Sequence, residues 1–305
     1  MRSTNKKNNI LFNAIIGVLL AALWFNVFFI HKTIGVVSWW LLHVLGIAGV
    51  IILITVLLFF VKDVIKEKKI AVSKVITLVL AAVMAFPVCW FFGAFQMAYP
   101  ARIDKSSPSV SIRLPFNEEV LVGWGGDSID TNYPHAVVPA ERWAYDLLMK
   151  PAMVKSKKLQ DYGIYDKEVI APISGTVVAA YDGEEDITPG TDDFISQEGN
   201  YIYIRVDETG TYLLMNHLKQ GSVLVKNGDH IIEGTVVGRV GNSGSTSEPH
   251  LHIHHQRQDP TKTSMFLAEG LPLYFRDING NSMPTGGMKT VTGGKVPSGE
   301  FISPK

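Results

Sequence analysis

A cluster of histidines in the C-terminal third of the chain is the densest group of side chains that could carry chemistry. It is the run 248–255, Glu-Pro-His-Leu-His-Ile-His-His. If this run is a β-strand, His250, His252 and His254 share one face, while Leu251 and Ile253 enter the core on the other face. Neutral imidazole is a common ligand of zinc. The alternation therefore predicts a metal site on the histidine face of a strand.

The surrounding sequence predicts the strands that would position this cluster. Short β-rich runs with glycine-containing turns between them follow residue 168, and this pattern is typical of an antiparallel β architecture. Residues 181–200 are acidic and glycine-rich with no clear period, which predicts a loop over one end of the sheet. The expected strands are Val169–Ala180, Tyr201–Val206, Tyr212–Leu218, Ile231–Val240 and His250–His254.

Four segments of this region resemble the LytM or lysostaphin-type zinc metallopeptidases. Residues 241–252, Gly-Asn-Ser-Gly-Ser-Thr-Ser-Glu-Pro-His-Leu-His, look like the family's turn into a His-Leu-His strand. Residues 225–238 are similar to its Gly-Asp-x-Val-x-x-Gly hairpin, 212–218 to its Tyr-x-His-Leu strand with an inserted spacing, and 170–178 to its Ala-Pro-x-x-Gly-x-Val strand. The resemblance covers roughly Trp124–Gln256. It implies an all-β metallopeptidase domain, an antiparallel sheet or sandwich like the duplicated hybrid motif.

The resemblance also implies roles for individual residues. Family members bind zinc with a His and an Asp four residues apart, and with the second His of the His-x-His pair. Carried over to this sequence, His252 and Asp146 are zinc ligands. His217 and His250 are the histidines that orient or deprotonate the attacking water and stabilise the tetrahedral intermediate. The position four residues before Asp146 departs from the pattern, because it is Arg142, whose guanidinium keeps its proton and cannot bind zinc.

This departure leaves three hypotheses for the first zinc ligand. In the first, a longer loop brings His135 to the metal at little cost, because the entropy of loop closure grows slowly with length. In the second, His254 replaces it, but His250 to His254 spans about 13 Å of strand at about 3.3 Å per residue, too far for one ion unless the strand bends. In the third, the site is degenerate, and the domain binds wall peptide or activates another hydrolase. The first is favoured, with His135, Asp146 and His252 as ligands.

Three protein ligands and an open position are what a catalytic zinc site needs. Such a site lowers the pKa of its bound water to about 7. His217 and His250 have intrinsic pKa values suited to passing a proton to the leaving nitrogen of an amide. The family's usual substrate is the peptide part of bacterial peptidoglycan, so the resemblance implies a zinc metalloendopeptidase of the cell wall. His230 and His255 have no place in these motifs and are expected to be exposed.

The first hundred residues have a different character. Three stretches of 21, 26 and 24 residues, Ile10–Ile30, Val36–Val61 and Val75–Ala98, contain no Asp, Glu, Lys or Arg. Each is long enough to cross a hydrocarbon core, which needs about 20 apolar residues in a helix. The sequence therefore predicts three transmembrane helices in a lipid bilayer. Pro87 is expected to kink the third, and three polar residues are expected to form hydrogen bonds between helices: Asn13, Asn26 and His43.

Charged residues predict the orientation of these helices and exclude other roles. Nine Lys and Arg against two Asp and Glu make residues 1–98 net +7, whereas residues 99–305 are net −7. The cations precede the first span and lie between the second and third, so the positive-inside rule places the N-terminus in the cytoplasm. A zero overall charge gives no reason to expect binding to nucleic acid. Cys89, the only cysteine, lies in a predicted span, which excludes thiol catalysis and disulfides in the exported part.

These patterns predict a multi-pass protein of the cell membrane with an extracytoplasmic C-terminal domain. The predicted parts are a membrane domain over 1–98, a linker over 99–121, a metallopeptidase domain over 122–258 and an irregular C-terminal extension over 259–305. Repeated prolines predict the linker, and a Gly-, Ser-, Thr- and Pro-rich composition predicts the extension. The expected fold class is three N-terminal transmembrane α-helices followed by an all-β domain.

Overall fold

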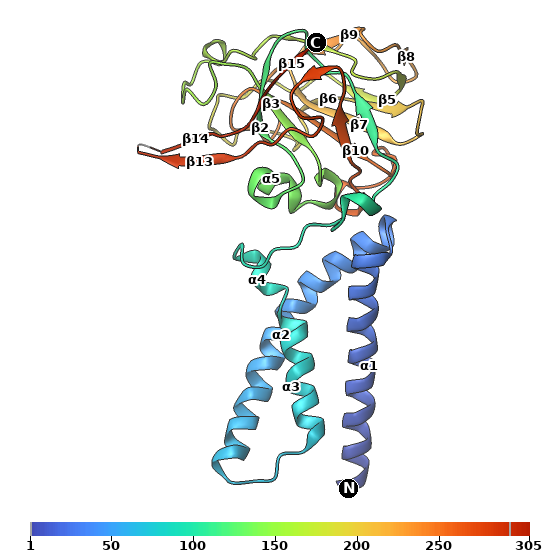
Figure 1. Ribbon diagram of the computed structural model, residues 1–305, viewed down its shortest axis with the longest axis vertical. Helices are drawn as coiled ribbons and strands as arrows, with labels where there is room; N and C mark the ends of the chain where they lie inside the picture. The colour runs from blue at the N-terminus through green and yellow to red at the C-terminus, as the bar shows by residue number, and fades with distance from the viewer. Residues whose placement is uncertain (1, 293) are drawn as a thin grey trace. The chain divides into compact units, whose positions relative to one another are not determined.

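A computed structural model of the protein describes residues 2–292 and 294–305, which fall into two compact units divided between Ala101 and Arg102. The first unit is helical and the second is built mainly from strands (Figure 1). The side chains of residues 2–8, 294 and 295 lie outside the described part. They include three of the cations on which the orientation prediction depends, Arg2, Lys6 and Lys7.

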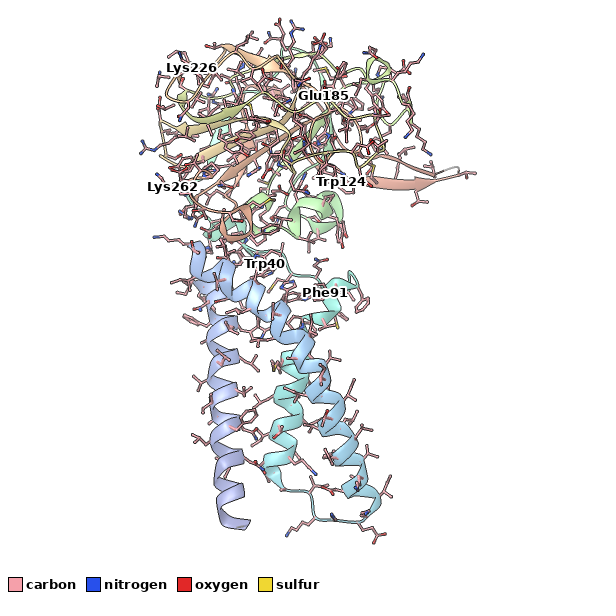
Figure 2. The ribbon with its side chains drawn as sticks, turned by 180° about the vertical axis from the view of Figure 1, so that it is seen from behind. Trp40, Phe91, Trp124, Glu185, Lys226 and Lys262 are labelled. Atoms are coloured by element: carbon pink, nitrogen blue, oxygen red, sulfur yellow. The ribbon has the colours of Figure 1, made fainter. Side chains whose placement is uncertain are left out.

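Three helices of the first unit are long and apolar enough to cross a membrane, over Asn9–Phe29, Lys32–Ile65 and Val72–Phe91. Large apolar side chains are exposed along them, and Phe91, for example, is 57% exposed (Figure 2). The third helix is interrupted beside Pro87, which has no N–H to donate, and it ends at Phe91 rather than at Ala98 as expected. The helices are α1 (Arg2–Phe29), α2 (Lys32–Ile65), α3 (Val72–Ala85) and α4 (Val88–Phe91).

Polar side chains join the three long helices. The Asn13 amide on α1 donates to a backbone carbonyl of α3 at 3.0 Å. The Asn26 amide donates to the Ser38 hydroxyl of α2 at 3.0 Å. These contacts confirm the interhelical role expected of the two asparagines. The expectation for His43 is wrong, because its Nδ1 donates at 2.8 Å to the carbonyl of Trp39, one turn earlier on the same helix.

A nine-stranded antiparallel sheet forms the centre of the second unit, in the order β12-β15-β2-β3-β10-β7-β6-β5-β8. Three two-stranded sheets flank it: β1-β11, β4-β9 and β13-β14. The strands are β1 (Val110–Ile112), β2 (Val120–Trp124), β3 (Tyr145–Leu148), β4 (Glu168–Ile170), β5 (Gly175–Tyr181), β6 (Asn200–Val206), β7 (Tyr212–Leu218), β8 (His230–Ile231), β9 (Val236–Arg239), β10 (Leu251–Gln256), β11 (Leu273–Phe275), β12 (Ile278–Asn279), β13 (Met288–Val291), β14 (Gly294–Pro297) and β15 (Phe301–Pro304).

The core of this unit lies against one face of the large sheet, because side chains alternate along each strand. Leu147 of β3, Met215 of β7, and Leu251 and Ile253 of β10 are fully buried in one cluster. The opposite face of the same three strands carries polar residues, which include Asp146 and His252. The predicted alternation of β10 is therefore confirmed, with the apolar residues in the core and the histidines on the other face.

Two expected strands are each divided into two. Val169–Ala180 contains β4 and β5, because the chain turns at Pro172, which cannot donate a hydrogen bond to a ladder. Ile231–Val240 contains β8 and β9, separated by a turn at Gly234 with φ +92°, a conformation that glycine adopts without steric cost. The loop expected over 181–200 is present between β5 and β6.

The segments at both ends of the second unit are more ordered than the sequence predicts. Within 99–121, Ile112 of β1 and Phe116 are buried in the core rather than forming an extended tether. Within 259–305, β15 pairs with β2 on one side and β12 on the other, so this part is not irregular. A physical reason is that β2 would otherwise leave a row of unpaired backbone groups at a sheet edge.

Candidate metal centre and active-site cavity

Strand register brings the predicted site residues together. β3 and β10 are neighbours, and Asp146 lies directly opposite His252. On its other side β10 pairs with β7, where Asn216 lies opposite His252. His217 follows Asn216 with a left-handed backbone, φ +64°. This conformation costs a non-glycine residue about 1 to 2 kcal/mol, and it lets two successive side chains of β7 line one cavity.

One carboxylate oxygen is the meeting point of three imidazoles. The Oδ1 atom of Asp146 is 3.1 Å from Nδ1 of His252, 3.3 Å from Nε2 of His135 and 3.4 Å from Nε2 of His250. His135 comes from α5 (Ile129–Ala136), and its side chain is buried. Burial alone would raise the pKa of Asp146, yet His135 and His250 beside it hold that pKa well below its usual value, so the carboxylate is ionised.

Hydrogen bonds fix the orientation of the His135 ring. Its Nδ1 lies 2.8 Å from Oδ1 of Asn132. The amide group of Asn132 donates to the carbonyls of Gly126 at 3.2 Å and Ala144 at 3.1 Å, which accept only, so Oδ1 must face His135. Nδ1 of His135 is therefore the donor. Its Nε2 faces Oδ1 of Asp146 at 3.3 Å. Burial alone would lower the pKa of His135, but the Asp146 carboxylate beside Nε2 raises it.

The same reasoning applies to two more histidines of the cavity. Nδ1 of His250 donates to the carbonyl of Glu248 at 2.8 Å, and Nδ1 of His217 donates to the carbonyl of Ser243 at 2.8 Å. Burial lowers the pKa of both histidines, that of His217 well below its usual value, so both imidazoles are neutral. Each neutral ring then has a lone pair on Nε2.

A chain of hydrogen-bonded side chains fixes the orientation of the His252 ring. The Gln256 amide donates to the carbonyl of Gln258 at 2.7 Å, so its oxygen faces Nε2 of His254 at 3.3 Å and accepts from it. Burial lowers the pKa of His254 well below its usual value, so its Nδ1 is a lone pair. That lone pair accepts from Nε2 of His252 at 2.9 Å. The other ring nitrogen of His252, Nδ1, faces Oδ1 of Asp146 at 3.1 Å.

The result is a compact group of two imidazole nitrogens around one ionised carboxylate oxygen. Oδ1 of Asp146 lies 3.1 Å from Nδ1 of His252 and 3.3 Å from Nε2 of His135. Imidazole nitrogens and carboxylate oxygens are common ligands of zinc. At the usual zinc–nitrogen bond length, two ligands of a tetrahedral site lie about 3.4 Å apart. The residue types and the spacing therefore fit zinc, the metal that the sequence predicts here.

Glu141 is a second acidic residue of this group, and no pattern in the sequence predicts it. One oxygen of Glu141 and one nitrogen each of His135 and His252 lie within 4.8 Å of one another. The contact to His252 is 3.8 Å long and reaches Nε2, the nitrogen that carries the proton. Asp146 lies closer to both imidazoles, at 3.1 and 3.3 Å, and is therefore the better match to a ligand. No motif position marks Glu141, and the only signal is its place just before Arg142.

Arg142 stabilises loops next to the site. Its Nη2 donates to the backbone carbonyl of Asp127 at 2.8 Å and to the carboxylate of Asp127 at 2.7 Å. The guanidinium also lies over the ring of Trp143, 4.8 Å from its centre. The arginine therefore links the loop between α5 and β3 to Asp127, which precedes α5. His135 lies on α5, between these two segments.

These residues line an open cavity of about 760 Å³. Its walls come from α5, the loop before β6, β7, and the turn before β10, so segments far apart in the sequence form one site. Besides the histidines and Asp146, the lining includes Trp124, Pro134, Val138, Glu198, Met265 and Phe266.

The two histidines outside the motifs differ in their environment. His230 is exposed, as expected, and pairs with Asp207 at 2.8 Å. The expectation for His255 is wrong, because it is 1% exposed on the core side of β10. Its Nδ1 donates to the carbonyl of Pro272 at 3.1 Å, and its Nε2 accepts from Thr211 at 2.6 Å. These partners satisfy a neutral ring away from the cavity.

Comparison with known proteins finds a family match within the β unit. Residues 159–263 match the model of Peptidase family M23. The chain carries an M23 peptidase domain. The matched residues include His217, His250 and His252, whereas His135 and Asp146 precede them.

Individual relatives of the M23 domain cover only part of this chain. Over 85 residues it is 32% identical to peptidoglycan DD-endopeptidase ShyC of Vibrio cholerae serotype O1, which is 28% of this chain and 18% of that protein. The chain thus spans less than a fifth of this relative. The solved catalytic domain of the antimicrobial peptidase lysostaphin from Staphylococcus simulans is 20% identical over 50% of this chain and 86% of its own, with a TM-score of 0.30. A zinc-containing peptidase from Vibrio cholerae is 16% identical over 48% and 36%, with a TM-score of 0.31.

Proposed function

We propose that the protein is a membrane-anchored zinc metalloendopeptidase that hydrolyses peptide bonds of bacterial peptidoglycan outside the cytoplasmic membrane. The observation that carries this proposal is the convergence of one nitrogen each of His135 and His252 on the ionised Asp146, beside an M23 match. The substrate class follows from the relatives, one of which is a peptidoglycan endopeptidase.

The proposed zinc ligands are Nε2 of His135, Oδ1 of Asp146 and Nδ1 of His252. When bound, zinc would lower the pKa of water and polarise the scissile carbonyl. Neighbouring side chains hold each ligand in place: Asn132 orients His135, and His254 orients His252. Such outer contacts commonly fix the ring orientation and tautomer of a metal-binding histidine.

His217 and His250 are the proposed proton carriers. Both rings line the cavity, and backbone carbonyls hold their Nδ1–H groups, so the Nε2 lone pairs are the available bases. Their lowered pKa values keep them neutral at pH 7, which is the form that can take a proton from the attacking water. Either ring can then deliver that proton to the leaving amide nitrogen.

The helical unit is proposed to anchor this domain in the lipid bilayer. Three helices have the length and composition of spans, and the cations between the second and third favour a cytoplasmic side there. An odd number of spans from a cytoplasmic N-terminus places the β unit outside, where wall peptides are accessible. We infer the same duplicated hybrid motif architecture for the β unit as for the LytM-type peptidases.

Zinc content and hydrolysis, measured on the same full-length protein in detergent, test the proposal. The wild type is expected to hold one zinc per chain and to release new amino groups from peptidoglycan, and His135→Ala is expected to lose both. His230→Ala is the matched control, because His230 is exposed and lies outside the cavity. Folded wild-type protein with neither zinc nor hydrolysis would refute the proposal and favour a degenerate module that binds wall peptide or activates another hydrolase.

A further inference from the structure

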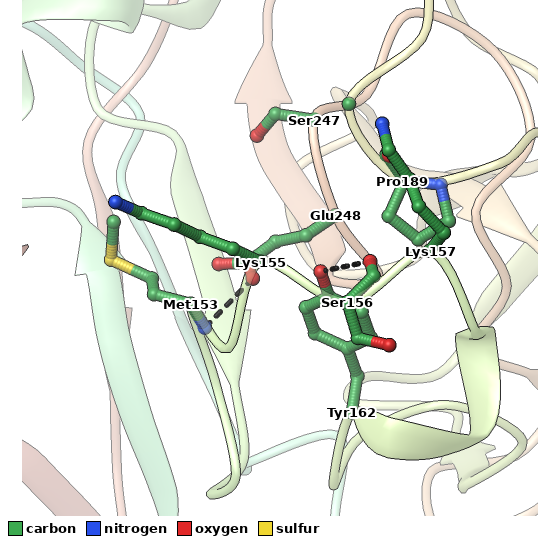
Figure 3. A pocket seen from close by; sticks show the side chains of 9 residues that line it. Met153, Lys155, Ser156, Lys157, Tyr162, Pro189, Ser247 and Glu248 are labelled. Carbon is green, nitrogen blue, oxygen red and sulfur yellow. Dashed lines mark hydrogen bonds between the residues drawn. The ribbon is translucent and has the colours of Figure 1, made fainter.

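A second, smaller cavity shares a wall with the candidate active site. Its volume is about 260 Å³, and loops from three parts of the chain surround it (Figure 3). One wall comes from residues 153–162 after β3, a second from Pro189 and Gly190, and a third from Ser247 and Glu248 before β10. Ser247 lines both cavities.

Glu248 connects the two cavities chemically. Its backbone carbonyl accepts from Nδ1 of His250 at 2.8 Å, so its main chain orients a proposed proton carrier. Its carboxylate lines the smaller cavity and accepts from the backbone N–H of Met153 at 2.8 Å (Figure 3). Burial raises the pKa of this carboxyl group, and the Met153 amide opposes that rise. A cation placed in the cavity would stabilise the carboxylate further.

Two lysines bring the opposite charge to the same cavity. Lys157 donates to the carbonyl of Pro189 at 2.9 Å, which leaves two of the three ammonium hydrogens for a ligand. Lys155 also lines the cavity. Met153 and Lys155 both have left-handed backbones, with φ 55° each. This conformation is costly for residues with side chains, and two such residues in a span of three hold the loop in a specific shape.

The remaining wall is largely apolar, with contributions from Met153, Pro189 and Tyr162. A cavity with apolar walls, one carboxylate and two ammonium groups fits an aliphatic chain that ends in both an amine and a carboxylate. We propose that it binds the side chain of a diamino dicarboxylic acid residue of a peptide substrate. Glu248 would hold the ammonium group of that side chain, and Lys155 and Lys157 would hold its carboxylate. The inference rests on the proposed function for the identity of the peptide.

The expected selectivity is moderate, because both lysines are exposed. One exposed ion pair typically contributes little, and a pair with a half-buried partner contributes more. A peptide with lysine at this position keeps the amine but lacks the carboxylate. We expect the protein to bind the diamino dicarboxylic peptide about 10-fold more tightly than the lysine peptide.

Binding without catalysis provides the test. Two fluorescent peptides that differ only in one residue, diaminopimelic acid or lysine, are titrated against chelator-treated full-length protein, and the anisotropy is measured. The wild type is expected to prefer the diaminopimelic acid peptide, and Lys155→Met and Glu248→Gln to reduce the preference to about twofold or less. Glutamine retains an acceptor for the Met153 amide. Lys158→Met is the matched control, since Lys158 is exposed but does not line the cavity.

Equal binding of the two peptides by the wild type, or an undiminished preference in folded Lys155→Met, would overturn the assignment. Cleavage of the same peptides by zinc-loaded protein separates this inference from the proposed function. A binding preference with no cleavage supports the subsite and rejects the peptidase. Cleavage of both peptides with no preference rejects the subsite and supports the peptidase.

Discussion

His254 should control the zinc affinity of the protein although it is not a proposed ligand. Its Nδ1 accepts from Nε2 of His252 at 2.9 Å, so Nδ1 is the nitrogen of His252 that faces the proposed metal position. In His254→Phe that acceptor is lost. The nearest other acceptor is Glu141, 3.8 Å away and beyond hydrogen-bond distance.

The expected size of the effect follows from this missing partner. Without zinc, the ring of His252 in the variant can change tautomer or turn, but zinc binding through Nδ1 fixes Nε2–H toward phenylalanine. A buried donor without a partner costs about 1 to 3 kcal/mol, so the penalty falls on binding. This corresponds to an increase of about 5- to 150-fold in the zinc dissociation constant.

Competition with a chromogenic zinc chelator, using full-length protein in detergent at pH 7.5, measures the effect. His254→Gln should recover part of the affinity, because an amide oxygen can accept from His252. His255→Phe is the control on the same strand: it removes two buried hydrogen bonds on the core side and should lower stability without changing zinc affinity. A His254→Phe affinity within twofold of the wild type would refute the reasoning.

Three further outcomes are expected. Asp146→Ala should abolish stoichiometric zinc binding, whereas Glu141→Ala should still bind zinc with at most about 10-fold weaker affinity. Metal analysis and chelator competition measure both effects. The reverse order of the two variants would identify Glu141 as the ligand. Burial lowers the pKa of His255 to about 4 from 6.5, so the unfolded chain takes up this proton first. The contribution of neutral His255 to the free energy of unfolding is complete above pH 6.5 and falls by about 3 kcal/mol as the pH decreases to 4. Hydrogen exchange of β10 should show a smaller loss of stability over this pH range in His255→Gln. Removing zinc by dialysis against a chelator should lower the unfolding temperature of the β unit, and zinc at 100 times its dissociation constant should restore about 2.7 kcal/mol; an unchanged transition would contradict binding to the folded state.

The sequence by itself determined the features that depend on local periodicity and composition. Three uncharged stretches predict helices long enough for a membrane, because length and hydropathy are properties of the segment alone. The alternation of Leu251 and Ile253 with histidines predicts the strand and its two faces, since side chains of a strand alternate regardless of its partners. The same rule puts His255 on the core face with Leu251 and Ile253, where Thr211 and Pro272 satisfy its ring, and the expected exposure of His255 is wrong for this reason.

Only the tertiary structure decided which side chains share the cavity. His135 lies eleven residues before Asp146, and the Asn132 amide, held by two backbone carbonyls, fixes the orientation of its ring. His217 lines the cavity because its backbone is left-handed, which no pattern of hydrophobicity indicates. The last strand, β15, pairs with β2, which lies near the start of the second unit in sequence. These contacts join residues that are distant in sequence. Their geometry depends on backbone groups, which all residues share, so the sequence does not indicate it.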